Sequence, residues 1–245
     1  MIPKLSDNSL DSRKRLAVIP ARGGSKRIPG KNLIEIGGQP IINYAINAAL
    51  NSNLFQKILI SSDDHLIIEH AKNFRNLSVN KRPSELSNDQ APVYATIKYE
   101  YEREILSGSF FDEVWLISAT ACLLEPLDLR RMALQFQSYP IKNAILGVTE
   151  YPVPVQWAME INEFGNLDSL DFDSFQKASQ NLKKYYHDTG CLAAFLPNAF
   201  SLFPNGIPQG NFAPFIIEKH KAIDIDNPED LKLAEALLHL SQRSL

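Results

Sequence analysis

Apolar residues along the chain alternate between short continuous runs and longer stretches with helical spacing. Residues 16–20 form an apolar run that is rich in β-branched residues and too short for a helix, so we expect a buried strand there. After Pro40, apolar positions recur every three or four residues, which predicts a helix. Further strands are expected at residues 57–61, 113–118 and 144–148, and further helices at about residues 64–74, 91–106 and 127–136. This alternation predicts an α/β fold in which a mostly parallel sheet carries helices on both faces.

The alternation is interrupted between residues 151 and 220, a proline-containing segment without a long helical pattern. A hairpin is expected near residues 162–166, where Asn and Gly are typical of a turn. We interpret residues 151–220 as an insertion that covers a site or forms a dimer contact. A strand at residues 221–225 and a helix at residues 228–240 are expected to complete a single domain over residues 16–245. Residues 1–15 form an N-terminal extension that we expect to be disordered.

The charge is unevenly distributed, although the net charge is only −3. Seven Lys and Arg residues and no acidic residue lie between residues 13 and 32, so the rest of the chain carries 18 basic and 28 acidic side chains. Proteins that bind nucleic acid need an extended basic face, whereas a short basic segment on an acidic chain is typical of a site for a compact anion. The distribution therefore indicates a nucleoside triphosphate and argues against a nucleic-acid partner. The sharper prediction concerns the four cations that follow the first strand, because residues 13–15 precede it and are as readily explained by solvation.

Two features bear on the cellular compartment. Cys122 and Cys191 are far apart in the sequence and no Cys/His cluster accompanies them, so neither a disulfide framework nor a structural zinc site is expected. No apolar run approaches the roughly 18–20 residues that span a bilayer, and the first 15 residues lack the apolar core of a signal peptide. We therefore expect a cytoplasmic protein that does not bind a membrane.

The strongest candidate for chemistry is the basic, glycine-containing segment at residues 19–32, directly after the first expected strand. Open α/β folds bind ligands at this edge of the sheet. Gly23 and Gly24 allow backbone N–H groups to point toward an anion, while nearby Lys and Arg side chains can neutralise phosphate charge. The segment is not a Walker A loop, because five residues separate Gly24 from Gly30 and Asn32 replaces the Ser or Thr that would hold magnesium. The plainer alternative is a solvated basic loop whose glycines serve a turn.

Asp224 and Asp226 form a second candidate. Residues two apart on a strand share a face, so the two carboxylates are expected to aim together at the carboxyl end of the strand at residues 221–225. Mg²⁺ takes one or two protein carboxylates and leaves its other positions to water and substrate phosphates. The alternative is helix capping by Asn227 and Pro228, which explains the residues after Asp226 but leaves Asp224 without a role.

Two further stretches carry weaker signals. Residues 81–89 are typical of an ordinary surface turn when taken alone. Residues 185–190 place His187 beside Asp188, a pair that can transfer protons, although such a pair in a loop is more often a structural element. Neither stretch decides the function by itself.

Taken together, these segments resemble the sialic-acid cytidylyltransferases, which are CMP-sugar synthetases. The residues that carry the resemblance are AVIPARGGSKRIPGKN at 17–32, SSDD at 61–64, RPSELSND at 82–89 and DIDNPED at 224–230. They follow the order of the family, and the match spans about residues 16–238. Three further segments look most like the pseudaminic acid branch, namely YPVPVQWA at 151–158, SQNL at 179–182 and HDTG at 187–190.

The resemblance implies a Rossmann-like nucleotidyltransferase fold with α/β/α layers, a mostly parallel mixed sheet and a small insertion that reaches the neighbouring subunit of a homodimer. It implies that CTP reacts with a nine-carbon 2-keto sugar acid, a nonulosonic acid, to give CMP-sugar and pyrophosphate. By position it implies that the nucleotide is bound by Ala21, Arg22, Gly23, Gly24, Ser25, Lys26, Lys31, Asn32, Arg82 and Asp89. It implies a sugar site lined by Gln156, His187, Asp188, Thr189 and Gly190. It also implies Mg²⁺ at Asp224 and Asp226.

The chemistry of these residue types agrees with the implied reaction. Attack of the sugar hydroxyl on the α-phosphorus requires mainly positioning and charge stabilisation. Arg22 and Lys31 are the expected catalytic cations, and Asp226 could take the proton of the attacking hydroxyl. The catalytic prediction therefore comprises these three side chains.

Two departures from the family pattern concern the expected sugar pocket. ATAC at residues 119–122 lacks the prolines that usually follow the preceding strand, and CLAA at residues 191–194 stands where aromatic residues are usual. Both changes are expected to enlarge or loosen the sugar pocket and to leave the nucleotide half unchanged. Pseudaminic acid stays the favoured acceptor. N-acetylneuraminic, legionaminic or 3-deoxy-octulosonic acid is an alternative within the same chemistry, and a non-catalytic nucleotide-binding homologue is an alternative from another class.

Overall fold

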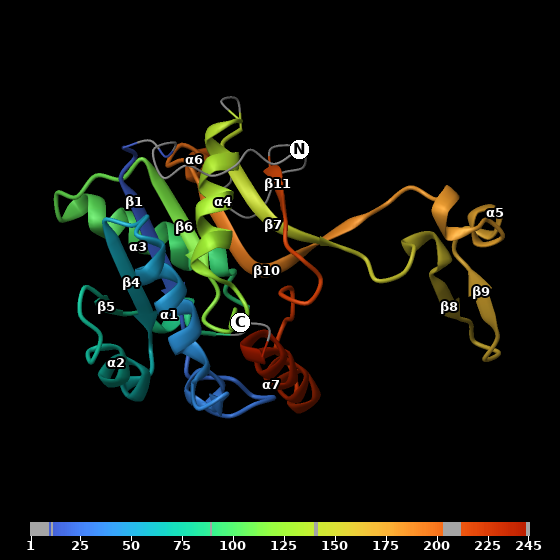
Figure 1. The fold of residues 1–245 in the computed structure, drawn as a ribbon, viewed down its shortest axis with the longest axis horizontal. Coiled ribbons are helices and arrows are strands. Elements are labelled where there is room, and N and C mark those ends of the chain that lie inside the picture. Colours follow the sequence, from blue (N-terminus) through green and yellow to red (C-terminus); the bar gives the residue numbers. More distant parts are fainter. Residues whose placement is uncertain (1–9, 11, 89, 140–141, 203–211, 244–245) are drawn as a thin grey trace.

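A seven-stranded sheet forms the centre of this computed structural model, which describes residues 10, 12–88, 90–139, 142–202 and 212–243 (Figure 1). Its strands are β1 (Arg15–Pro20), β4 (Lys57–Ser62), β5 (Ser78–Lys81), β6 (Glu113–Ile117), β7 (Ala144–Glu150), β10 (Tyr186–Phe195) and β11 (Phe212–Ile216). They lie in the order β11-β7-β10-β6-β1-β4-β5, and only β10 runs antiparallel to its neighbours. The predicted α/β fold with a mostly parallel mixed sheet is confirmed.

Helices cover both faces of the sheet, so the side chains of β1 are buried whichever face they point to. On one face, Ala17 and Ile19 belong to the core cluster that includes α1 (Ile41–Ser52), α2 (His65–Ala71) and α4 (Pro126–Gln137). On the other face, Leu16 and Val18 pack with α3 (Val93–Leu106) and α6 (Ala199–Leu202). The last helix, α7 (Pro228–Arg243), packs against the segment that follows β1.

The shorter elements lie in the connections. They are η2 (Lys31–Leu33), β2 (Glu35–Ile36), β3 (Gln39–Pro40), η3 (Ser84–Leu86), η4 (Val155–Trp157), β8 (Met159–Ile161), β9 (Leu167–Ser169), α5 (Phe172–Phe175) and η5 (Ser179–Asn181), where η denotes a 3₁₀ helix. None of the helices in the described part of the chain has the length and apolarity required to cross a membrane.

The predicted insertion at residues 151–220 divides into two parts. Residues 151–185 leave the sheet and form an arm that projects from the body of the molecule (Figure 1). The arm contains the predicted hairpin, in which β8 and β9 pair and Asn162 donates its N–H to the carbonyl oxygen of Asn166. After the arm, β10 and β11 return to the central sheet, so the segment outside the sheet is shorter than predicted. Most of the N-terminal extension, residues 1–9 and 11, lies outside the described residues.

The strand predicted at residues 221–225 is wrong, because this stretch has no strand hydrogen bonding. The position beside β7 is taken by β11, which the sequence pattern missed. Pro214 lies within β11 and is tolerated because β11 is an edge strand, where a missing N–H costs no pairing. The apolar alternation that suggested a strand instead places Ile225, which is fully buried, in a cluster with Ile28 and Leu238.

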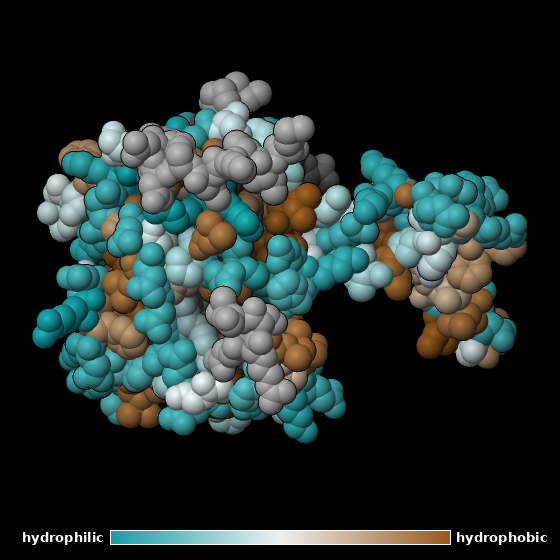
Figure 2. All heavy atoms as spheres, viewed as in Figure 1, coloured by the Kyte–Doolittle hydropathy of each residue, from teal (hydrophilic) through white to brown (hydrophobic). Residues whose placement is uncertain are grey.

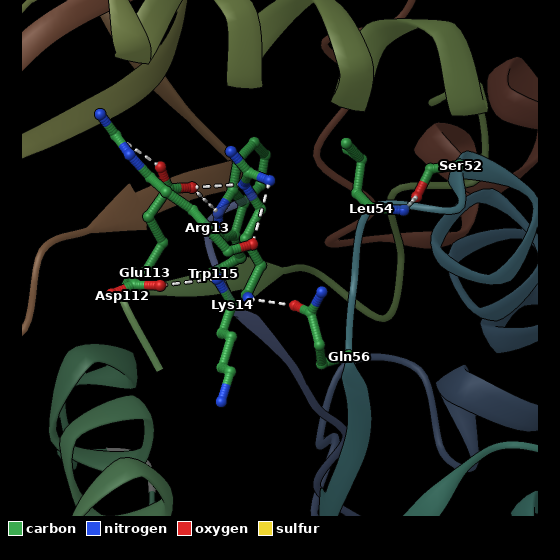
Figure 3. Close-up of polar contacts among 9 residues, drawn as sticks. Arg13, Lys14, Ser52, Leu54, Gln56, Asp112, Glu113 and Trp115 are labelled. Carbon is green, nitrogen blue, oxygen red and sulfur yellow. Dashed lines mark hydrogen bonds and ion pairs between the residues drawn. The ribbon is translucent and has the colours of Figure 1, made fainter. Parts of the chain in front are cut away.

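A buried ion-pair cluster closes the amino end of β1 (Figure 3). The Glu113 carboxylate is completely buried and accepts hydrogen bonds from Arg15 Nε at 2.9 Å, Arg13 Nη1 at 2.8 Å and Trp115 Nε1 at 2.8 Å. These contacts separate residues 13–15 from the four cations of the loop, and they show that Arg15 is buried and paired instead of solvated. Arg13, Lys14 and Arg15 precede or begin β1, whereas the basic loop follows its carboxyl end, so only the cations of the loop can share a site there.

Candidate active site

The basic loop leaves β1 at the carboxyl edge of the sheet and is tied to the neighbouring strand β4. Ala21 donates its N–H to the carbonyl oxygen of Ser61 at 2.9 Å. Asn32, which is 6% exposed, donates from Nδ2 to the carbonyl oxygen of Arg22 at 2.9 Å. These contacts fold the loop back on itself, so the predicted anion-binding segment is a defined turn with its two ends held together.

The two adjacent glycines of the loop have different surroundings. Gly23 donates its N–H to Asp63 Oδ1 at 3.0 Å, and a Cβ at Gly23 would lie only 2.5 Å from Asp64 Oδ2. A Cβ at Gly24, in contrast, would meet no atom within 4 Å among the described residues. Gly23 is therefore required for close packing against the protein, whereas Gly24 borders open space in which an anion can be accommodated.

The acidic segment from the C-terminal part of the chain contacts the basic loop. Lys31 Nζ donates to the carbonyl oxygen of Ile225 at 2.5 Å and lies 3.7 Å from Asp226 Oδ1. Arg27 Nη2 lies 2.7 Å from the same oxygen. Two of the four cations of the loop, which are Arg22, Lys26, Arg27 and Lys31, therefore share one carboxylate.

Asp224 and Asp226 lie close to one another although they do not belong to a strand. Asp224 is exposed and Asp226 is half-buried. Partial desolvation and the neighbouring Asp226 carboxylate raise the pKa of Asp224, while Lys31 acts in the opposite direction. The alternative of helix capping holds for the residues that follow, because Asn227 Oδ1 accepts the N–H of Asp230 and Asp230 Oδ2 accepts the N–H of Asn227. Capping leaves the side chains of Asp224 and Asp226 available for another role.

Arg82 is a buried cation at the same edge of the sheet, directly after β5. It is 6% exposed, and its Nη1 lies 3.4 Å from Thr96 Oγ1. Its Nε and Nη2 atoms are buried without a hydrogen-bond partner among the described residues, although Nη2 lies 3.6 Å from Asp63 Oδ1. Burial lowers the pKa of Arg82 and the nearby Arg22 acts in the same direction, whereas Asp63 opposes both. Asp89, the other nucleotide-binding residue predicted in this stretch, lies outside the described residues.

The residues predicted to bind sugar at 187–190 begin β10, which places them at the same edge of the sheet because β10 runs antiparallel. Asp188 Oδ1 accepts the N–H of Gly190 at 2.8 Å, and Asp188 Oδ2 lies 3.5 Å from the hydroxyl of Tyr94 on α3. Burial and the nearby Asp188 raise the pKa of Tyr94. Thr189 is buried and donates to the carbonyl oxygen of Gly147, so its hydroxyl holds β10 against β7.

Gln156 is not brought to this edge within the chain, since it lies in η4 on the projecting arm. Its Nε2 donates to the carbonyl oxygen of Lys183 at 2.9 Å, and its buried Oε1 has no partner among the described residues. Near it, a cavity of about 320 Å³ is lined by two of the segments that resemble the pseudaminic acid branch, residues 151–155 and residues 179–182. The arm therefore carries its own concave surface, separate from the basic loop.

The two segments that depart from the family pattern lie side by side. Ser118 donates its N–H to the carbonyl oxygen of Cys191 at 2.8 Å. Ala119, Ala121 and Cys122 are all at most 5% exposed and belong to the apolar core. The expected effect on the sugar pocket would therefore act through packing, because these side chains do not line an open surface.

Sequence reasoning missed two residues that contact predicted site residues, Asp63 and Tyr94. Asp63 belongs to the SSDD segment that carries the resemblance, but no role in the site was predicted for its side chain; the neighbouring Asp64 caps α2 by accepting the N–H of Leu66. The available signal for Asp63 was its place directly after a buried strand at the ligand-binding edge of the sheet. No local signal in the sequence indicates Tyr94, because its contact with Asp188 joins residues 94 positions apart.

Comparisons with known proteins agree with this arrangement. Residues 16–138 match the sequence model of a family described as cytidylyltransferase. A pseudaminic acid cytidylyltransferase from Campylobacter jejuni is 34% identical over 94% of this chain and 99% of its own length. A CMP-N,N'-diacetyllegionaminic acid synthase from Legionella pneumophila is 29% identical over 94% of this chain and 98% of its own length. A solved structure of a CMP:2-keto-3-deoxy-manno-octonic acid synthetase complexed with CTP has a TM-score of 0.66 at 18% identity and covers 93% of this chain and 99% of its own, a likeness of fold.

Proposed function

The chain belongs to the cytidylyltransferase family, and from that premise we propose that it transfers CMP from CTP to pseudaminic acid with release of pyrophosphate. The observation that carries the proposal is the meeting of the loop after β1 with the Asp226 segment at the carboxyl edge of the sheet. A relative named for this activity, 34% identical over nearly the whole of both chains, supports the choice of acceptor. Arg82 after β5 and residues 187–190 at the start of β10 lie at the same edge of the sheet, whereas Gln156 lies on the arm.

In the proposed reaction the protein mainly positions reactants and stabilises charge, because phosphoryl transfer needs little covalent chemistry from the enzyme. The loop after β1 would hold the triphosphate in the open space beside Gly24. Arg22, Lys31 and Arg82 would stabilise the charge that develops on the phosphates. Asp226 is the carboxylate proposed to take the proton of the attacking sugar hydroxyl.

Asp224 and Asp226 fit the chemistry of Mg²⁺, which prefers carboxylate oxygens and accepts as few as one or two of them from the protein. No cluster of three or more His, Cys, Asp or Glu side chains suited to a metal is present in the described residues. The proposed site therefore needs phosphate oxygens of CTP as further ligands. When bound there, the ion would supply positive charge opposite the leaving pyrophosphate.

The arm supports the proposal of a homodimer. Large apolar side chains are exposed along it, among them Ile161 at 74%, Phe164 at 80% and Leu170 at 66%. Brown, hydrophobic spheres accordingly gather at the lower end of the arm in Figure 2. Contact with a second copy would cover these side chains, and it offers a way for Gln156 to approach a sugar site. A cytoplasmic location stays a prediction.

The acceptor is tested by incubating the protein with CTP, Mg²⁺ and each of four sugar acids while pyrophosphate release is followed. Pseudaminic acid is expected to give the fastest release, with legionaminic, N-acetylneuraminic and 3-deoxy-octulosonic acids as the competing substrates. Fastest release with one of the other acids would refute the proposed acceptor and keep the enzyme class. CTP binding without release for any acid would favour the non-catalytic homologue.

The roles of the carboxylates are tested by Asp226→Asn, which should nearly abolish turnover and leave the melting temperature unchanged. Glu229→Gln is the matched control, because Glu229 is an exposed acid in the first turn of α7 nearby. Near-normal pyrophosphate release from Asp226→Asn would refute both the metal-binding and the proton-accepting role.

A further inference from the structure

Asp63 lies between two segments of the proposed nucleotide site. Its Oδ1 atom accepts the N–H of Gly23 at 3.0 Å and lies 3.6 Å from Arg82 Nη2. We propose that Asp63 is a positioning residue for CTP, which aligns the Arg82 guanidinium with the loop after β1 before the nucleotide binds. This inference rests on the proposed function, because CTP is the ligand whose affinity it concerns.

The first argument is that Asp63 has no other structural task among its neighbours. The N-cap of α2 is Asp64, whose side chain accepts the N–H of Leu66 at 2.7 Å. Ser62 Oγ in turn accepts the N–H of Asp64 at 3.1 Å, which fixes the turn that carries both acids. The helix therefore starts without help from the Asp63 side chain, and that carboxylate is directed at the loop and at Arg82 instead.

The second argument is the burial of Arg82. A guanidinium that is 6% exposed needs a counter-charge, since an unpaired buried charge is strongly destabilising. Asp63 provides that charge at 3.6 Å, beyond direct hydrogen-bond distance, so Nη2 still lacks a hydrogen-bond acceptor. The Asp63 carboxylate thus holds the Arg82 guanidinium in place and leaves its Nε and Nη2 groups able to donate hydrogen bonds to an anionic ligand.

The third argument is the close contact between the Asp63–Asp64 turn and the loop. A Cβ at Gly23 would lie 2.5 Å from Asp64 Oδ2, so the backbone of the loop rests directly on this turn. The backbone of Arg82 is fixed to the same place, because its N–H donates to the carbonyl oxygen of Ser62 at 2.8 Å. One carboxylate oxygen therefore contacts both segments that are proposed to hold the phosphates.

A positioning role and a purely structural role predict different responses to substitution. If Asp63 acts through Arg82, removal of its charge weakens CTP binding only while Arg82 is present. If Asp63 only stabilises the fold, the same change lowers the melting temperature and affects CTP binding regardless of residue 82. A double-mutant cycle separates the two roles.

The test measures CTP affinity by titration calorimetry on the full chain with Mg²⁺ and without any sugar acid. Asp63→Asn keeps an acceptor for Gly23 but loses the charge, and it should weaken CTP binding roughly tenfold, within the range of couplings between contacting residues. Asp64→Asn is the matched control: it removes the same charge from the same turn and keeps a good N-cap, so affinity should change less than about twofold. In the Arg82→Ala background, Asp63→Asn should cause no further loss.

Equal effects of Asp63→Asn and Asp64→Asn would overturn the proposal, as would the same factor of loss with and without Arg82. Should Asp63→Asn not fold, Asp63→Glu replaces it in the cycle, because it keeps the charge and displaces the oxygen atoms. Absence of CTP binding by the unchanged protein would contradict the proposed function itself. If the unchanged protein binds CTP normally but the double-mutant cycle shows no coupling between Asp63 and Arg82, only the role of Asp63 is contradicted.

Discussion

Replacing Glu113 by Gln should destabilise the protein strongly and leave its affinity for CTP unchanged. Glu113 is fully buried at the amino end of the sheet, and Arg15 beside it is 2% exposed (Figure 3). The amide of Gln keeps the shape of the side chain but leaves the Arg15 guanidinium without its buried counter-charge. Removing one partner of such a pair typically costs about 3–5 kcal/mol. The loss of charge-assisted hydrogen bonds from Arg13 and Arg15 acts in the same direction.

For a chain of this length, each kcal/mol lowers the melting temperature by about 2–4 °C, so Glu113→Gln should lower it by roughly 6–20 °C. Glu69→Gln is the control for loss of a single carboxylate. Glu69 lies 2.6 Å from Lys72, but both side chains are more than half exposed, at 65% and 57%. Exposed pairs contribute about 0–1 kcal/mol, so this variant should change the melting temperature by only a few degrees at most.

The assay combines thermal unfolding followed by circular dichroism with calorimetric CTP titration at a temperature at which both variants are folded. The six residues of β1 separate Glu113 from the basic loop by about 20 Å, so unchanged CTP affinity is expected. A melting temperature within about 2 °C of the unchanged protein would refute the assignment of a structural ion pair. A clear loss of CTP affinity would show that the cations near Arg15 belong to the anion site after all.

Three further predictions follow from burial and exposure. Gly24→Ala should weaken CTP binding and leave the melting temperature unchanged. Gly23→Ala should lower both the CTP affinity and the melting temperature, because only at Gly23 would a Cβ clash with Asp64. Equal melting temperatures for the two variants would contradict this. Burial raises the pKa of Cys122 to about 11 and that of Cys191 to about 12, so both thiols should stay protonated and resist alkylation at pH 8 until the protein is unfolded, as mass spectrometry can measure. Phe164→Arg on the arm should convert a dimer to a folded monomer in sedimentation experiments.

Much of the fold could be predicted because the signals are local. The apolar run of β1 and the helical spacing of α1 are each contained within a dozen residues and bounded by Gly, Pro or Asn. β11 could not be found in this way, since Pro214 argues against a strand unless its edge position is known. The Arg15–Glu113 pair joins residues 98 positions apart, and the sequence holds no pattern that links them. The sequence therefore could not show that Arg13 and Arg15 are paired with a buried carboxylate.

The sequence could predict those parts of the candidate site that the order and direction of the strands bring to the carboxyl edge of the sheet. Loops that follow parallel strands meet at one edge of a sheet, which is why the loop after β1 was expected there. Arg82 was expected in the site only from the resemblance, because no strand was predicted where β5 lies. The Asp226 segment reaches the same edge without being a strand, because Ile225 is anchored under α7. What the sequence could not indicate is the orientation of individual side chains, such as the choice between Asp63 and Asp64 as the cap of α2.

The charges of the loop are partly balanced from within the chain, and this bears on how the proposed site can hold a triphosphate. Asp226 contacts Arg27 and Lys31, and Asp63 lies beside Arg82, so two carboxylates lie close to cations that the phosphates would need. These carboxylates therefore partly screen the positive charge of the loop and of Arg82. Nucleotide binding then becomes an exchange of counter-ions. Phosphate oxygens would replace part of the contact between Arg27 and Asp226, and Mg²⁺ is the proposed counter-ion for the carboxylate released in this way. On this reasoning CTP and the metal should bind together more tightly than either does alone.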